Sequence, residues 1–209
     1  KYFRQEKAVE SGFYISDEWD VSDNFSVNLG LRFNNYALLG SQDVYIYPEN
    51  QPRIRNNIID TLHFSKNELV KSYNNLDFRV AAKYMLTDNI SVKGSYNRLH
   101  QYLFMLSNTI AVSPTNKWKL CDYHIEPMKS NQYSVGFFTN LADNVWELSV
   151  EAYFKDIKNL VEYKDGANLD VNEIPETDVL QGDLDAYGVE FMVKKPYGRL
   201  NGWFNYTYS

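Results

Sequence analysis

Hydrophobic and polar residues alternate along most of this chain, and helical periodicity is nearly absent. The clearest stretch, 25–34, reads Phe-Ser-Val-Asn-Leu-Gly-Leu-Arg-Phe-Asn. In an extended strand its apolar residues share one face and its polar residues share the other, whereas a helix at 100° per residue would scatter both sets. The alternation therefore predicts β-strands that each have one apolar and one polar face.

The same pattern marks eight segments, two of which are noisier. In one of these, 13–21, Asp17 falls on the apolar face, and the other is 133–141. The eight predicted strands are 13–21, 25–34, 76–86, 90–97, 133–141, 146–155, 187–194 and 200–209. The charged residues predicted on the polar face are Arg32, Arg79, Lys83, Lys93, Glu147, Glu151 and Glu190.

The connections between these strands alternate between tight and long. The tight ones are 22–24, 87–89, 142–144 and 196–198, and the long ones are about 40–71, 107–129 and 164–183. In an antiparallel meander, all tight turns then lie at one end of the sheet, as in outer-membrane barrels with short periplasmic turns. We therefore predict an all-β, antiparallel up-and-down meander of about eight strands that forms part of a transmembrane β-barrel.

Aromatic residues near the tight turns fit the same interpretation. Trp19 and Phe25 bracket the first turn, and Trp146 and Tyr187 follow or flank later ones. Aromatic side chains of this kind form girdles at membrane interfaces. We expect these four residues at the periplasmic interface.

Composition at first argues against a membrane protein. The mean hydropathy of the 209 residues is −0.48, and no run of about 18 apolar residues predicts a transmembrane helix. However, a barrel strand needs only every second residue to be apolar, so the 44% of apolar residues suffices. The net charge of −6 argues against nucleic acid as a partner, and the single cysteine rules out a disulfide framework.

Neither catalytic nor metal chemistry has a clear sequence signal. Cys121 and His124, with His63 and His100 elsewhere, match no compact metal-site spacing. The third long loop is acidic, but its carboxylates are too scattered for a calcium loop. We therefore expect no catalytic residues, no metal site and no cofactor. The candidate substrate contacts are aromatic and charged residues of the long loops, each of which could instead only shape its loop: Tyr45, Tyr47, Arg53, Arg55, Trp118 and His124.

Several motifs resemble TonB-dependent outer-membrane receptors. The stretch 11–19 followed by 25–33 resembles that family's Glu-Trp, turn, Asn-Leu-Gly-Leu-Arg-aromatic hairpin. The stretch 125–137 is similar to the family's entry into a barrel strand, and 150–161 to the strand that follows. Tyr187-Gly-Val-Glu190 with 205–208 is similar to the next hairpin, and 113–120 is similar to Bacteroides-type receptors. The order matches over essentially the whole chain.

The resemblance implies a receptor for energised uptake of a scarce substrate, such as a ferric siderophore, cobalamin or a glycan. In that family a 22-stranded barrel surrounds a plug domain, which contacts TonB. Residues 1–209 would then be an internal barrel segment without the plug and with strands missing on both sides. The implied setting is the outer membrane of a Gram-negative bacterium, with outer-membrane lipid around the apolar face. A fragment with two open sheet edges could also self-associate.

Two other classes remain open on the residues alone. The chain could be a complete eight-stranded outer-membrane barrel, acting as an adhesin or structural protein, or a soluble lipocalin-like binding module. A terminal Phe or Trp and a preceding signal peptide in the full gene would favour the small barrel. Solubility without detergent would favour the soluble module. An upstream plug would favour the receptor.

The face assignment makes a direct prediction. Leu29→Arg should impair insertion by about 2–4 kcal/mol, because it puts a charge on the lipid face near mid-membrane. Asn28→Arg, one position away on the polar face, should be tolerated. Folding into lipid vesicles measures both, and equal tolerance of the two variants would show that the faces are assigned wrongly.

Overall fold

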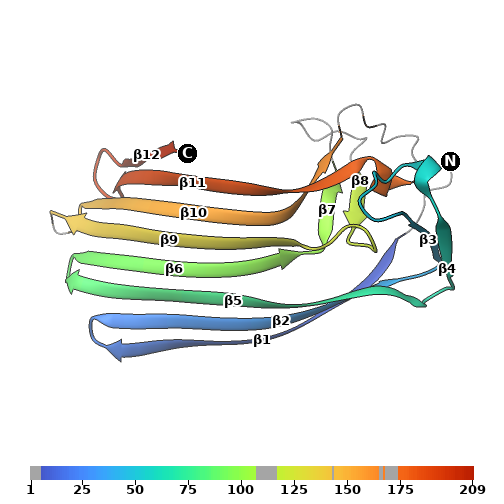
Figure 1. The fold of residues 1–209 in the computed structure, drawn as a ribbon. Helices are drawn as coiled ribbons and strands as arrows, with labels where there is room; N and C mark the ends of the chain where they lie inside the picture. Colours follow the sequence, from blue (N-terminus) through green and yellow to red (C-terminus); the bar gives the residue numbers. More distant parts are fainter. Residues whose placement is uncertain (1–5, 107–116, 143, 165–166, 168–173) are drawn as a thin grey trace.

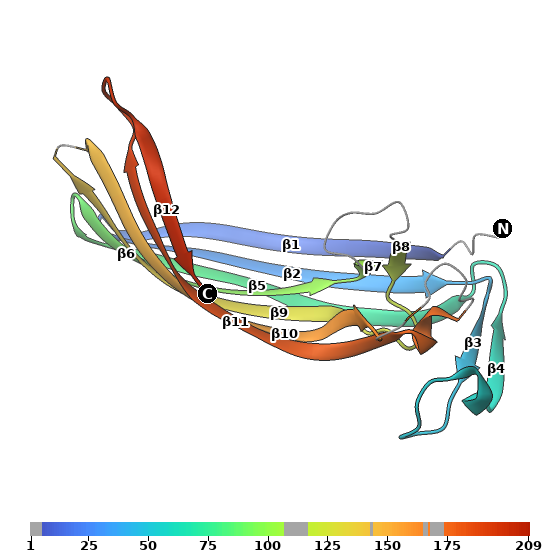
Figure 2. The ribbon, with the colours of Figure 1, turned by 90° about the horizontal axis from the view of Figure 1, so that it is seen from above.

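A computed structural model describes residues 6–106, 117–142, 144–164, 167 and 174–209 of the chain. Eight antiparallel strands form one curved sheet in the order β1-β2-β5-β6-β9-β10-β11-β12 (Figures 1 and 2). This order confirms the predicted up-and-down meander. The strands are β1 (Lys7–Ser22), β2 (Phe25–Leu39), β5 (Leu69–Thr87), β6 (Ile90–Gln101), β9 (Met128–Leu141), β10 (Trp146–Tyr163), β11 (Val179–Lys195) and β12 (Gly202–Tyr208).

The register keeps the alternating apolar positions of neighbouring strands on one face. Phe33 pairs with Phe13 on one side and with Leu76 on the other. Farther across the sheet, Tyr96 pairs with Tyr133, and Tyr133 pairs with Phe154. Since side chains alternate with a period of two, this pairing joins the apolar residues into one continuous surface, here called the apolar face.

Much of the apolar face is exposed in the isolated chain. Phe13 is 74% exposed and Val135 is 56% exposed, although both lie within long strands. A soluble monomer rarely exposes a contiguous apolar surface of this extent, so the face requires an apolar environment. The opposite surface, here called the polar face, carries Arg32, Arg79 and Glu151, as predicted.

The tight turns lie at one end of the sheet and the long connections at the other (Figure 1). Ala142 and Asn144 adopt left-handed backbone conformations with φ of 52° and 66°, and the Val145 N–H donates to the Ala142 carbonyl. Asparagine tolerates this conformation because its short polar side chain can bond locally. Residue 143 of this turn lies outside the described residues.

One aromatic residue is placed differently from the prediction. Trp19, Phe25 and Trp146 do lie beside tight turns on the apolar face. The prediction for Tyr187 was wrong, because Tyr187 lies midway along β11, opposite Phe154 midway along β10, and not beside a tight turn. With Tyr96 and Tyr133 it forms an aromatic row at the opposite limit of the apolar face.

The long connections contain structure that the alternation did not predict. The first carries the hairpin β3 (Gln42–Ile46) and β4 (Asp60–Phe64), joined through the 3-10 turn η1 (Arg55–Asn57). The second carries β7 (Leu103–Leu106) and β8 (Lys117–Leu120), and the third carries the 3-10 turn η2 (Pro175–Thr177). These strands have four or five residues each, too few for a reliable period-2 pattern. Part of the 113–120 motif and much of the acidic loop, including Asp165, Asp170 and Glu173, lie outside the described residues.

The main buried cluster lies at the loop end of the sheet. It is built from Tyr36, Leu38, Val44, Val70, Tyr102, Phe104, Leu106, Cys121, Ile125 and Val179. Among the described residues, the part of the sheet nearer the tight turns contributes none of these side chains, so the long connections have a core of their own. In the described part of the chain, no helix is both long enough and apolar enough to cross a membrane.

Candidate functional site: the loop cap

The three long connections meet over the polar face at the loop end of the sheet. We call this assembly the loop cap, comprising the described residues within 40–68, 102–106, 117–127 and 174–178. Tyr36 and Leu38 belong by parity to the polar face, yet they are 1% and 0% exposed. The cap therefore covers the wall of β2 and removes these side chains from water.

Tyr36 fixes the second connection to β2. Its ring stacks on Tyr102 with centroids 5.0 Å apart and planes 5° apart. Its hydroxyl donates to the backbone carbonyl of Cys121 over 2.7 Å. A buried hydroxyl needs such an acceptor, because leaving it unpaired costs free energy. The connection that begins at β6 is thus held over a strand two places away in the sheet.

A buried ammonium group organises the cap. The Lys119 side chain is 6% exposed, and its Nζ contacts Asp122 Oδ2 at 2.6 Å and Glu6 Oε1 at 2.5 Å. Burial would lower the pKa of Lys119, but the two carboxylates outweigh it and raise the pKa. The other Asp122 oxygen accepts from the backbone N–H groups of His124 and Ile125 at 2.7 and 2.8 Å. One charge cluster therefore fixes β8, the start of β1 and the turn at 121–125.

Four of the predicted site residues come together around His124. The His124 Nε2 lies 2.7 Å from the Tyr45 carbonyl, an acceptor, so Nε2 carries the proton. Arg53 donates to the His124 carbonyl over 3.0 Å, and the Tyr47 ring meets the imidazole edge-on at 5.4 Å. These contacts join the β3–β4 hairpin to the second connection.

The other two predicted site residues are not part of this group. Trp118 lies on β8 opposite Met105 and is 68% exposed. Arg55 lies in η1, on the exposed part of the first connection. Sequence reasoning missed Lys119, Glu6 and Glu176. In β8, Lys119 follows the exposed Trp118, so its side chain points to the opposite, inward side. Recognising 117–120 as a strand in the sequence would have indicated this.

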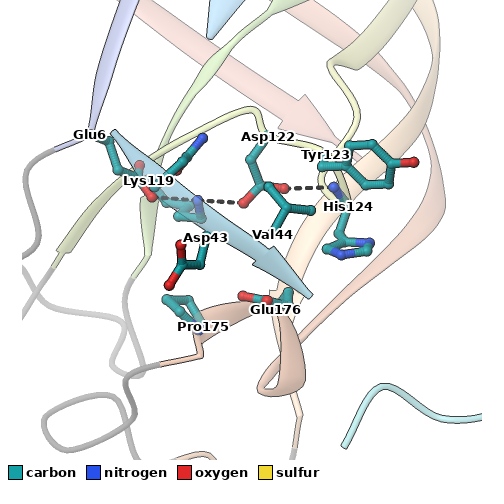
Figure 3. Close-up of a pocket in the computed structure, with 10 residues that line it drawn as sticks. Glu6, Asp43, Val44, Lys119, Asp122, Tyr123, His124, Pro175 and Glu176 are labelled. Atoms are coloured by element: carbon teal, nitrogen blue, oxygen red, sulfur yellow. Dashed lines mark hydrogen bonds and ion pairs between the residues drawn. The ribbon is translucent and has the colours of Figure 1, made fainter. Parts of the chain in front are cut away.

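A small polar cavity of about 20 Å³ lies inside the cap (Figure 3). Glu6, Asp43, Lys119, Asp122, His124 and Glu176 contribute to its lining. Glu176 is 8% exposed, and burial raises the pKa of its carboxyl group. Burial also raises the pKa of Tyr47 to about 12. The volume suits about one water molecule, so the cavity is too small for a transported substrate.

The cap offers no metal site among the residues that the structure describes. No three His, Cys, Asp or Glu side chains there are placed to hold a metal ion. His63 contacts Asp43 and His100 contacts Asp77, so the two histidines have different carboxylate partners. Burial raises the pKa of the Cys121 thiol, which keeps it protonated.

Removing the ammonium group should open the cap. Lys119→Met leaves Glu6 and Asp122 buried without their cation, a loss of about 3–5 kcal/mol for a buried pair. We expect faster hydrogen exchange at 117–127 in the folded protein. Lys66→Met, which removes an exposed lysine between β4 and β5, should leave this exchange unchanged. Equal protection in both variants would contradict the role of Lys119.

Cap stability should also depend on Glu176. Its pKa is raised in the folded state, so its contribution is present below the ordinary value of 4.5 and is lost as pH rises through the raised value. We expect the free energy of cap opening, from hydrogen exchange corrected for intrinsic rates, to decrease as pH rises above 4.5. Glu176→Gln should flatten this dependence, whereas Glu162→Gln, at an exposed site, should preserve it. An unchanged pH profile in Glu176→Gln would exclude this carboxyl group as the source.

Comparisons with solved structures show the same fold in outer-membrane proteins. The ferric-catecholate import receptor Fiu of E. coli shares 21% identity, with a TM-score of 0.56 over 96% of this chain and 27% of that chain. The FrpB iron transporter of Neisseria meningitidis shares 13%, with a TM-score of 0.57 over 97% and 26%. The ferripyoverdine receptor of Pseudomonas aeruginosa shares 19%, with a TM-score of 0.52 over 97% and 23%. This chain thus spans about a quarter of each.

The family comparison covers the whole chain. A family model described as "TonB dependent receptor-like, beta-barrel" matches residues 1–209. A comparison of the sequence with curated proteins found no match. The narrower resemblance to Bacteroides-type receptors gains no support from these neighbours. The apolar face therefore meets lipid in the outer membrane of a Gram-negative bacterium, and the polar face lines the barrel interior. The chain belongs to the TonB-dependent receptor family, as part of its transmembrane β-barrel.

Proposed function

We propose that this chain forms one section of the wall and mouth of a transporter for energised uptake of a scarce substrate. The observation that carries the proposal is the position of the loop cap, which folds over the polar face at the end opposite the tight turns. In a membrane barrel this is the external end of the interior. A preformed cap there narrows the entrance and gives a substrate a structured surface to contact.

The polar face also supports a partner inside the barrel. Glu151 and Glu190 lie directly opposite each other on β10 and β11. Like charges in this position are destabilising, so a cationic group facing them would be favourable. On the same polar face, but nearer the β1 edge of the sheet, lie the basic residues Arg79 of β5 and Lys93 of β6. We propose that a plug domain, which would carry the TonB contact, presents basic groups to β10–β11 and acidic groups to β5–β6.

The substrate class is proposed from the names of the neighbours. They are described as a ferric-catecholate import receptor, an iron transporter and a ferripyoverdine receptor. A ferric siderophore is therefore the first candidate, with cobalamin and glycans as alternatives. Of the predicted contacts, Trp118 is the best placed, because its large side chain is 68% exposed. Tyr45, Tyr47, Arg53 and His124 would act mainly by holding the cap in shape.

Uptake by the complete receptor tests the function. Cells that carry it as their only such receptor should accumulate radiolabelled ferric siderophore in a TonB-dependent manner. Trp118→Ala should raise the KM for uptake, whereas Tyr197→Ala, an exposed aromatic at the tight-turn end, should not. Absence of TonB-dependent uptake of siderophores, cobalamin and glycans would reject the proposal.

The plug contact has a separate test. The double variant Glu151→Gln, Glu190→Gln should loosen the plug and let large antibiotics such as vancomycin leak in, which growth inhibition measures. Glu18→Gln, an exposed carboxylate on the polar face of β1, is the control. Equal antibiotic sensitivity of the two would argue against a cationic partner at the pair.

A further inference from the structure

One charged side chain lies within the apolar face. Asp17 is on β1, where its outward neighbours along the strand are Ile15 and Trp19. Its register partner is Leu29, the third of the five outward apolar residues of β2. Asp17 therefore lies near the middle of the lipid-facing surface of this strand pair and not at either limit. Neither the loop cap nor the proposed uptake accounts for a carboxylate in this place.

The described part of the chain supplies no counter-charge for Asp17. The residue is exposed, and none of the ion pairs or side-chain hydrogen bonds among the described residues involves it. On β2, the outward residues on either side of Leu29 are Val27 and Leu31, which are apolar as well. Ionisable side chains that face the hydrocarbon region are costly, and proteins retain them where a partner compensates the charge. The compensating group therefore comes from outside the described residues.

The position of β1 limits where this group can come from. β1 pairs with β2 on one side and forms the edge of the described sheet on the other (Figure 1). In lipid the backbone N–H and C=O groups of that edge must be paired within the protein, so a closed barrel has another strand there. Directly opposite residues of antiparallel strands have Cβ atoms about 5 Å apart. A lysine or arginine opposite Asp17 would thus reach its carboxylate from within the barrel wall.

We propose that the strand paired with the open edge of β1 carries a lysine or arginine directly opposite Asp17, and that this ion pair fixes the register of the two strands. The proposal rests on the place of this chain in a membrane barrel and not on the proposed uptake. The partner is defined by its chemistry, a cationic side chain on the lipid face at the level of Asp17.

The ion pair would select one register where apolar pairs cannot. A slip of two residues keeps each strand's apolar and polar faces in place, so apolar contacts alone would tolerate it. The same slip would move the cation opposite Ile15 or Trp19 and leave Asp17 unpaired in lipid. A slip of one residue would turn the cation to the aqueous side, with the same result. A single polar contact within an apolar surface is known to select one alignment of paired elements.

The sign of one substitution tests the pair. In the complete receptor folded into lipid vesicles, Asp17→Leu removes a carboxylate but leaves the partner cation on the lipid face without its counter-charge. We expect the equilibrium ratio of folded to unfolded receptor to decrease by about tenfold or more. An unpaired Asp17 would give an increase instead, because leucine is more favourable in lipid than a carboxylate. Glu18→Gln removes the adjacent carboxylate on the polar face, and it should change the ratio by less than about twofold.

Disulfide scanning locates the partner residue. Asp17→Cys should cross-link to a cysteine placed directly opposite it on the neighbouring strand. We expect the natural residue at that position to be lysine or arginine. Asp17→Lys alone should impair folding, because it places two cations side by side. Replacing the partner residue by aspartate in the same variant should raise the ratio again by about tenfold.

Three results would overturn the proposal. The first is an unchanged or increased ratio in Asp17→Leu, and the second is a partner position that holds neither lysine nor arginine. The third is cross-linking of position 17 to a separate membrane protein, which would assign Asp17 to a lateral interface. Should Asp17→Leu fail to insert, Asp17→Asn keeps the shape and removes the charge, so a lower ratio supports the pair and a higher one rejects it. Absent siderophore uptake would reject the transport proposal alone.

Discussion

The in-register antiparallel ladder is the constraint on which the rest of the structure depends. In lipid every backbone amide and carbonyl must be paired within the protein, so the strands must hydrogen-bond to one another along their whole membrane length. The pairing of Phe33 with Leu76 and of Tyr133 with Phe154 shows that apolar positions stay aligned from strand to strand. A one-residue slip would exchange the two faces, which neither lipid nor the aqueous interior would tolerate.

Above the membrane the same ladder serves a different purpose. At the loop end, the polar face carries the buried side chains of Tyr36 and Leu38, and the long connections fold back onto them. Their packing depends on the buried Lys119, whose two carboxylate partners come from positions 6 and 122. The cap is therefore a small domain built on the wall of the barrel. The outward face changes at the same level, from the row of Tyr96, Tyr133 and Phe154 to polar side chains hydrogen-bonded around Asn131.

Alternation was sufficient to predict the eight strands and their faces, including the position of Asp17 on the apolar face opposite Leu29. It failed for Tyr187, because β11 begins at Val179, earlier than the alternation indicated, so Tyr187 lies at mid-strand and far from the tight turn that follows Lys195. The short hairpins β3–β4 and β7–β8 also escaped it, because four or five residues give too few alternations to stand out. Trp118 and His124 were singled out by residue type alone, and that could not distinguish an exposed side chain from one tied into the cap.

Sequence alone determined the strand periodicity, the tight and long connections and thus the apolar and polar faces, because these are local properties of an extended chain. Only the tertiary structure decided which distant groups meet. Glu6 reaches Lys119, Tyr36 reaches Cys121, and Arg98 meets Asp156 through Asn131. The physical reason is that partners for a buried charge or hydroxyl are fixed by the curvature and stagger of the sheet and by loop packing, none of which has a period along the chain.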